Sequence, residues 1–494
     1  MALGRLEPND PPRAPWAIPL IVGLVASAIA VWRLSPTRDA ITVALSSSAE
    51  IRGSEPGGEP ADVPHPPPPP RCTELPAEPF ILGDAPAPPR EAGDAGTVDP
   101  GEEIEDSIAP FAVEIGRGTV FEGGFAAGAR RDAEGGAVAM VATLGADGTG
   151  GKLVRLGRSR GDLDPPVVTG AGASVLAVLV EPNASGRALR VARVTGTEVT
   201  WGAEFSEGRD DSLAVDIAAS GARAVVVWDD ILGAPAGAND AARRSSVMLA
   251  SFDVATMRGV TPARPISARS TDASSPRLIT RPGGYWLAYL AHGEEDAAKK
   301  KARKHDDGKH DDEGEAVDQG EAITTGWIEV EPLDEGGTPT GAARAITPKS
   351  GHVLSFDLEL GENGSALLAF RDDDTPTGSS GGKVSVALVR LGGGGEPRVL
   401  VEEAGSAGAP DLLPGWISLA SVNGATRLAA MTPAGELLDE LAPEPSLGTG
   451  EPIAATTDRI LWARPMGKAM RLSVVRCRQR IAVDAGASEA GDGG

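Results

Sequence analysis

Residues 354–374 read LSFDLELGENGSALLAFRDDD. Apolar and polar residues alternate over 354–360, and a second apolar run occupies 366–370. Between the runs, residues 361–364 read Gly-Glu-Asn-Gly, and Asn-Gly is a strong hairpin signal when it lies between alternating apolar segments. The acidic residues that follow mark the end of the second strand. This stretch therefore predicts two antiparallel strands joined by a tight turn.

The same pattern recurs along the rest of the chain. A second clear copy runs from 212–217 through a Ser-Gly turn into 224–228 and ends on Asp229 and Asp230, which we expect on a solvated rim. Further hairpins are expected around 137–144, 174–180, 285–291, 416–421 and 460–463. Third strands follow most hairpins, as at 247–252, 326–330 and 384–389, and a poorer fourth follows in some copies, as at 398–401.

Four antiparallel strands repeated every roughly 40 to 70 residues are typical of propeller blades. We therefore predict an all-β fold, a β-propeller of about seven blades, with six or eight as neighbouring counts and two stacked β-sandwiches as the alternative. A helical fold is disfavoured by 64 Gly and 41 Pro in 494 residues. The last copy has three strands at most, so we expect residues 111–115 to supply the strand that closes the ring.

The N-terminal part has a different composition. Residues 16–32 read WAIPLIVGLVASAIAVW, an uncharged run long enough to span about 25 Å as a helix. We expect an uncleaved transmembrane anchor there, with a cleaved signal peptide or a buried helix as alternatives. Residues 33–107 are rich in proline, as at 64–70, which favours a disordered spacer. The apolar segment 80–82 interrupts this stalk, and could instead dock onto the folded domain.

The expected organisation is therefore a tail at 1–15, an anchor at 16–32, a stalk at 33–107, a propeller at 108–481 and a disordered tail at 482–494. A charged insert at 292–321, with six basic and eleven acidic residues, is expected to be disordered. The chain has two cysteines, Cys72 and Cys477, which bracket the propeller. Because the ends of a ring meet, we predict a disulfide between them, with two unpaired thiols as the alternative.

Few residues indicate metal binding or catalysis. The insert repeats a His-Asp-Asp triplet, so divalent-cation binding has weak candidates there: His305, Asp306, Asp307, His310, Asp311 and Asp312. No other cofactor is predicted. Only His352, among five histidines, borders the predicted core. The repeated boxes and the tyrosine nucleophile of sialidases are missing, and nothing in the sequence selects a pair of catalytic carboxylates.

The charge balance and the overall pattern limit the class of protein. A net charge of -24 argues against nucleic-acid binding. In its anchor, its proline-rich stalk and copies such as AVVVWDD at 224–230, the chain resembles uncharacterised exported, membrane-anchored β-propeller-like proteins of myxobacteria. The resemblance is loose over residues 72–480 and implies no functional residues.

We therefore expect a single-pass protein of the bacterial inner membrane, whose C-terminal domain lies in the periplasm or is exported. The expected function is non-catalytic binding of an envelope protein or polysaccharide. The alternative is a divergent glycan-cleaving hydrolase on a sialidase-like propeller.

Overall fold

The computed structural model describes residues 71–83, 113–133, 136–159, 164–183, 186–208, 214–231, 244–268, 271–294, 324–373, 383–391, 397–404, 408–420, 425–444 and 446–478. All of these residues belong to one compact unit. The predicted anchor at 16–32, most of the predicted stalk and the tail at 482–494 lie outside them. Within the described ranges, no helix has the length and apolar character needed to cross a bilayer.

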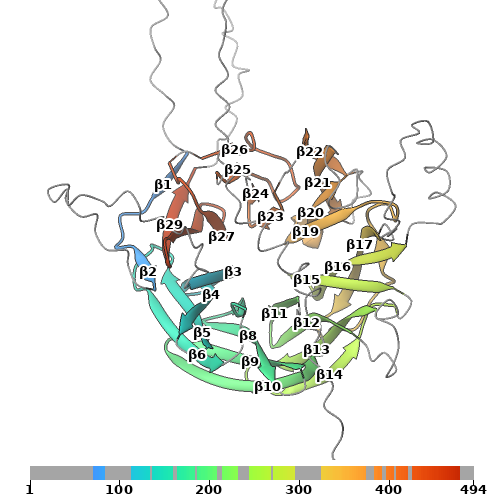
Figure 1. Ribbon diagram of the computed structural model, residues 1–494, viewed down its shortest axis with the longest axis horizontal. Helices are drawn as coiled ribbons and strands as arrows, with labels where there is room; N and C mark the ends of the chain where they lie inside the picture. Colours follow the sequence, from blue (N-terminus) through green and yellow to red (C-terminus); the bar gives the residue numbers. More distant parts are fainter. Residues whose placement is uncertain are drawn as a thin grey trace, which may run out of the picture. The chain divides into compact units, whose positions relative to one another are not determined.

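The described strands form seven antiparallel sheets, which follow one another around a ring (Figure 1). Blade 1 contains β3 (Val113–Phe121), β4 (Gly124–Ala133), β5 (Gly136–Gly145) and β6 (Lys152–Ser159). Blade 2 contains β7 (Val167–Ala171), β8 (Ser174–Asn183), β9 (Gly186–Thr195) and β10 (Glu198–Gly208). Blade 3 contains β11 (Val215–Ser220), β12 (Arg223–Ile231), β13 (Ser245–Asp253) and β14 (Gly259–Pro265).

The remaining blades repeat this order, with the first strand of each nearest the axis. Blade 4 contains β15 (Asp272–Arg281), β16 (Gly284–Glu294), β17 (Thr324–Asp334) and β18 (Arg344–Ala345). Blade 5 contains β19 (Val353–Leu360), β20 (Ala366–Asp373), β21 (Lys383–Leu391) and β22 (Arg398–Ala404). Blade 6 contains β23 (Pro410–Leu413), β24 (Trp416–Leu419), β25 (Arg427–Ala430) and β26 (Ala442–Pro443). Blade 7 contains β27 (Glu451–Ala455), β28 (Arg459–Met466) and β29 (Ala469–Cys477), together with β1 (Cys72–Glu74) and β2 (Phe80–Leu82).

The predicted seven-bladed propeller is therefore confirmed, and the two-sandwich alternative is wrong. The hairpin at 354–370 forms as β19 and β20, joined by a short 3-10 turn. In that turn Asn363 has a φ of 56° and Gly364 a φ of 76°. Both values lie in the left-handed region, which glycine and asparagine tolerate best. The Asn-Gly pair is thus required by the geometry of the turn.

The hydrophobic core is divided into clusters that lie between neighbouring blades. The cluster between blades 2 and 3, for example, packs Phe205 of β10 against Trp228 of β12 and Phe252 of β13, with ring centroids 6.4 Å and 6.2 Å apart. Residues 224–230 of β12 are all buried because both faces of the blade are covered. Each blade consequently depends on two neighbours for its burial.

The ring is closed by strands from the N-terminal part of the chain. Strand β1 pairs with the C-terminal half of β29, and β2 pairs with its N-terminal half. The predicted closing strand at 111–115 is wrong, because Val113 begins β3, the innermost strand of blade 1. The propeller therefore takes strands from 72–82, which the sequence analysis assigned to the stalk; segment 80–82 docks as one of them.

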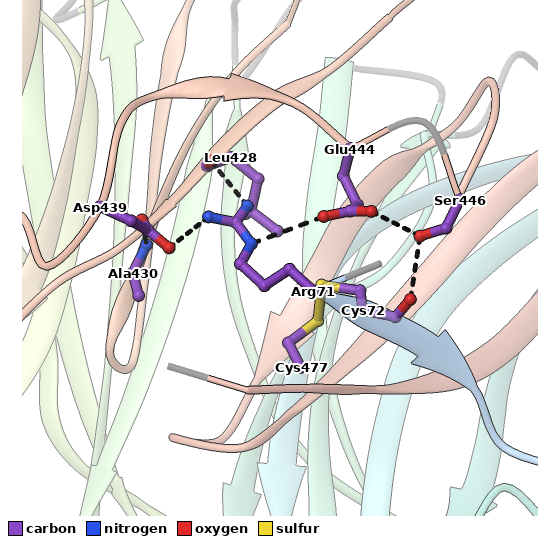
Figure 2. Close-up of polar contacts among 8 residues, drawn as sticks. All are labelled: Arg71, Cys72, Leu428, Ala430, Asp439, Glu444, Ser446 and Cys477. Carbon is purple, nitrogen blue, oxygen red and sulfur yellow. Dashed lines mark hydrogen bonds and ion pairs between the residues drawn. A yellow bond between two sulfur atoms is a disulfide. The ribbon is translucent and has the colours of Figure 1, made fainter. Parts of the chain in front are cut away.

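A disulfide and a buried arginine hold this closure (Figure 2). Cys72 of β1 and Cys477 of β29 are opposite each other in register and form the disulfide predicted from the sequence. Arg71, with 8% of its side chain exposed, donates to Asp439 at 2.5 Å and to the carbonyl of Leu428 at 2.8 Å. Its Nε lies 3.6 Å from Glu444. The chain segment that closes blade 7 is thereby also attached to blade 6.

The charged insert begins later than predicted. Strand β16 continues through Glu294, and its last residues pair with the start of β17: His292 with Gly326, and Glu294 with Thr324. His292 is therefore a strand residue. Residues 295–323, which contain the six predicted metal candidates, lie outside the described residues.

The disulfide leads to a prediction for stability. Replacing both Cys72 and Cys477 with serine should lower the free energy of unfolding by about 5 kcal/mol, because the bond restricts the unfolded chain across a separation of 405 residues. Urea denaturation measures this, and reductant should produce the same loss in the wild type. Two alkylatable thiols in the non-reduced protein would contradict the disulfide.

A second prediction concerns Arg71. Arg71→Met should lower the free energy of unfolding by about 3 kcal/mol, because the change leaves Asp439 and Glu444 buried without their cation. Thermal unfolding measures the effect. Arg476→Met, which removes an exposed arginine on β29, is the matched control and should change the midpoint little. Equal midpoints for the two variants would show that Arg71 does not hold the closure.

Candidate functional site: a charged cluster at the propeller axis

Charged side chains from six of the seven innermost strands come together at the axis of the ring. They are Arg117 on β3, Asp216 on β11, Arg277 on β15, Asp357 and Glu359 on β19, Asp411 on β23 and Glu451 on β27. Charged groups are rarely placed in a protein interior unless they are paired or have a function. This axial cluster is therefore the candidate functional site.

Arg117 reaches across the ring from blade 1 to blades 5 and 6. It donates a hydrogen bond and forms an ion pair with Asp357 of β19, and it donates to the carbonyl of Leu412 of β23 at 2.8 Å. Strand β3 has a register shift between Ile115 and Gly118, so Arg117 lies in a β-bulge, a feature that redirects side chains. Gly118 allows the close approach of blade 7, since a Cβ there would lie 3.2 Å from both the Cβ of Ala454 and the carbonyl oxygen of Ile453.

Arg277 occupies a similar position on blade 4. Strand β15 has a register shift between Ser274 and Arg277, and Arg277 Nε lies 3.8 Å from Asp357 Oδ1. Asp216 of blade 3 accepts a hydrogen bond from the backbone N–H of Leu278 at 2.8 Å. Both axial arginines are thus carried on bulges and directed at the same carboxylate.

Asp357 is the centre of the cluster. Only 1% of its side chain is exposed, whereas Arg117 and Arg277 expose 31% and 30% of theirs. Its Oδ2 also accepts from the backbone N–H of Leu412 at 2.7 Å. Burial by itself lowers the pKa of Arg117, but the adjacent negative charges, above all that of Asp357, more than compensate and raise it. Arg117 therefore keeps its positive charge beside Asp357.

Two other axial carboxyls hold their protons more tightly. Burial raises the pKa of Asp411 to about 7, the negative charge of Asp357 adds to the effect, and Arg117 and Arg277 oppose it. Burial also raises the pKa of Glu359 to about 7, against the attraction of Arg117. Near neutral pH these two groups therefore exchange protons readily, close to the Arg117–Asp357 ion pair.

This arrangement can recognise a polar ligand in several ways. Arginine N–H groups and protonated carboxyls donate hydrogen bonds, and ionised carboxylates accept them. A carboxyl that can give up a proton near neutral pH, with a second carboxyl beside it, also supplies a general acid and its partner. Among the described residues, no group of three or more His, Cys, Asp or Glu is arranged to hold a metal ion.

The acidic residues expected on a solvated rim have a different role. Asp229 and Asp230 are buried within β12, at 6% exposure each, and Asp229 accepts hydrogen bonds from the backbone N–H groups of Ala214 and Ser275, both at 2.8 Å. Asp229 thus binds backbone groups at the seam between blades 3 and 4, and because both side chains are buried, the expected solvated rim is wrong for this pair.

The sequence analysis did not identify the axial cluster. Its signal was present as charges that interrupt apolar innermost strands, such as Asp216 in VDIAAS and Asp357 in VLSFDLEL. None of these charges was singled out from the sequence, because each looks like an ordinary polar position in an alternating strand. Arg117 gave a weaker signal, because its strand begins where the stalk was expected to end.

No protein-family model matches the chain, and no curated protein matches it. Similar solved structures include the β-propeller domain of the Trilobed protease from Pyrococcus furiosus, at 10% identity and a TM-score of 0.43, covering 74% of this chain and 95% of that one. The polysaccharide lyase Uly1 is 10% identical with a TM-score of 0.45, covering 75% and 91%. An α-L-arabinanase from Penicillium chrysogenum is 10% identical with a TM-score of 0.35, covering 61% and 89%.

These similarities concern the repeated-blade fold. The assignment of seven blades rests on the strand pairing described above. At such identities and TM-scores, the similarities do not indicate what this chain binds or whether it catalyses a reaction.

The raised pKa of Asp411 predicts a pH dependence of stability. Because the folded protein keeps this proton up to about pH 7, whereas an unperturbed aspartate loses it near 3.8, the fold binds more protons between these values. The contribution of the Asp411 carboxyl to the free energy of unfolding is thus present at low pH and is lost as the pH rises toward about 7. Asp411→Asn should remove that loss, so its melting temperature relative to the wild type should rise between pH 4 and pH 8.

The control for this measurement is Glu436→Gln, which changes an exposed carboxyl on the same blade. It should follow the wild-type pH profile. A difference between Asp411→Asn and wild type that stays constant from pH 4 to pH 8 would contradict the raised pKa.

Proposed function

We propose that the axial cluster is the ligand-binding site of this propeller and that its ligand is a hydroxyl-rich polymer, an envelope polysaccharide. The observation that carries the proposal is the convergence of Arg117, Arg277 and Asp357 from three blades, with the two arginines partly accessible. Protein-binding surfaces are depleted of charge at their centres, which makes a polar axial site less suited to a protein partner. Alternating donors and acceptors suit the hydroxyl groups of a sugar.

We further propose that the propeller is tethered by 16–32 to the bacterial inner membrane and lies on the periplasmic side or is exported. The uncharged apolar run supports the tether. The disulfide supports an oxidising location, because such bonds are rare in the reducing cytosol. Protease added to spheroplasts should degrade the propeller domain only if it lies outside the cytoplasm, and protection until lysis would contradict this location.

A second candidate function is glycan cleavage, which a specific observation favours. Asp411 and Glu359 hold protons up to about pH 7 near Asp357, which is paired with Arg117. Glycosidases use two carboxyl groups in unlike protonation states, one as the acid and the other as the base or nucleophile. The axial cluster offers such a set, whereas the sequence alone selected none.

Binding and turnover measured on the same glycan panel separate the two functions. Arg277→Gln should weaken binding of the recognised glycan at least tenfold, because it removes an accessible axial donor whose own ion pair, at 3.8 Å, is long. Arg398→Gln, on the outermost strand of blade 5, is the control and should leave binding unchanged. Equal binding by all three proteins would exclude the axis as the binding site.

Turnover decides between binding module and hydrolase. If the wild type cleaves the recognised glycan and Asp411→Asn lowers the rate at least a hundredfold while binding is retained, the protein is a hydrolase. Binding without any released reducing ends, in the wild type and in Asp411→Asn alike, identifies a non-catalytic binding protein.

A further inference from the structure

A serine and a histidine on blade 4 form a hydrogen-bonded pair that has no part in the axial cluster. Ser274 lies near the start of β15 and His292 near the end of β16, and the Ser274 Oγ is 2.9 Å from the His292 Nε2. The two strands are neighbours in the sheet (Figure 1). Both residues are only half-buried, so a ligand in solvent can reach them.

The backbone beside the serine is held in an uncommon conformation. Ser275 has a φ of 52°, in the left-handed region that costs a non-glycine residue about 1 kcal/mol or more. The residue lies in the β15 bulge, and its N–H donates to the buried carboxylate of Asp229 at 2.8 Å. Asp216 accepts from Leu278 at the other end of the bulge, also at 2.8 Å. Two carboxylates of blade 3 therefore hold the segment that presents Ser274.

An acidic residue also stands next to the histidine. Asp272 is the register partner of His292, and its Oδ1 accepts from the backbone N–H of Ser245 at 2.8 Å, which fixes its position. Burial lowers the pKa of His292, and the negative charge of Asp272 only partly offsets that effect. The imidazole is thus neutral near neutral pH, the state in which its nitrogen can accept a proton from the serine hydroxyl.

A serine whose hydroxyl is hydrogen-bonded to a neutral histidine, with a carboxylate beside the histidine, has the parts of an activated nucleophile. We propose that Ser274 and His292 are the nucleophile and general base of an esterase site whose substrates are carboxylic esters. Esters are the suitable class because their alcohol leaves more readily than the amine of an amide. This activity is separate from glycan binding at the axis and does not depend on it.

The reaction balances with water as the only co-reactant. The Ser274 oxygen attacks the ester carbonyl carbon while its proton passes to the His292 Nε2. The carbon–oxygen bond to the alcohol then breaks, and the alcohol leaves with that proton. Water attacks the acyl-serine with His292 again accepting a proton, the acid is released, and the proton returns to the Ser274 oxygen.

Covalent labelling of the full-length protein tests this site. An alkyl fluorophosphonate should phosphonylate Ser274 in the folded wild type, as seen by mass mapping of the labelled peptide. Ser274→Ala should abolish this label. His292→Gln keeps the serine but lacks the base, and should slow labelling at least tenfold. Ser174→Ala is the control: its hydroxyl is exposed and bonded to Thr195 at 2.7 Å, and labelling of Ser274 should be unchanged.

Folding is checked by near-UV circular dichroism, so that a loss of labelling is scored only in folded protein. The wild type should also release p-nitrophenol from p-nitrophenyl acetate, with an initial burst that His292→Gln lacks. The proposal is overturned if folded wild type carries no label on Ser274, or if His292→Gln is labelled at the wild-type rate. In either case the pair is a structural cross-strand hydrogen bond.

Discussion

Closure of the ring is the constraint on which the rest of this structure depends. Each blade buries apolar side chains on both faces, as β12 shows with an unbroken buried run, so an open ring would leave two apolar faces exposed to water. The N-terminal strands complete blade 7, and the Cys72–Cys477 disulfide and Arg71 hold them in place. The disulfide acts on the unfolded chain, whereas the arginine acts through buried charge in the folded state.

The axial cluster is a consequence of closure. Arg117 and Asp357 belong to blades that are not neighbours, and their side chains can meet only because the innermost strands face one axis. Arg117 lies in a bulge of β3 and Arg277 at the end of a bulge of β15, and both side chains reach Asp357. Burial among the innermost strands removes water from the other carboxyls, which is why Asp411 and Glu359 keep their protons up to about pH 7.

The bulge in β15 of blade 4 positions polar side chains at both of its ends. The β15 bulge directs Arg277 to the axis at one end and presents Ser274 to His292 at the other. Its conformation is maintained by carboxylates of blade 3, with Asp229 bound to the N–H of Ser275. Packing between blades thus sets the geometry of polar groups as well as burying apolar ones.

The sequence by itself determined the hairpins, and it predicted a propeller of about seven blades and the pairing of the cysteines. Hairpin signals are local: Asn363 and its neighbours set a turn whose strands pair within a few residues. Only the tertiary structure decided which strand closes the ring, where β16 ends and which charges meet. Arg117 and Asp357 are 240 residues apart, and neither residue type nor spacing encodes their contact. The alternation of apolar and polar residues and the turn residues act between neighbours in the chain. Contacts at the axis instead depend on how all seven blades pack into a closed ring, which brings distant residues together.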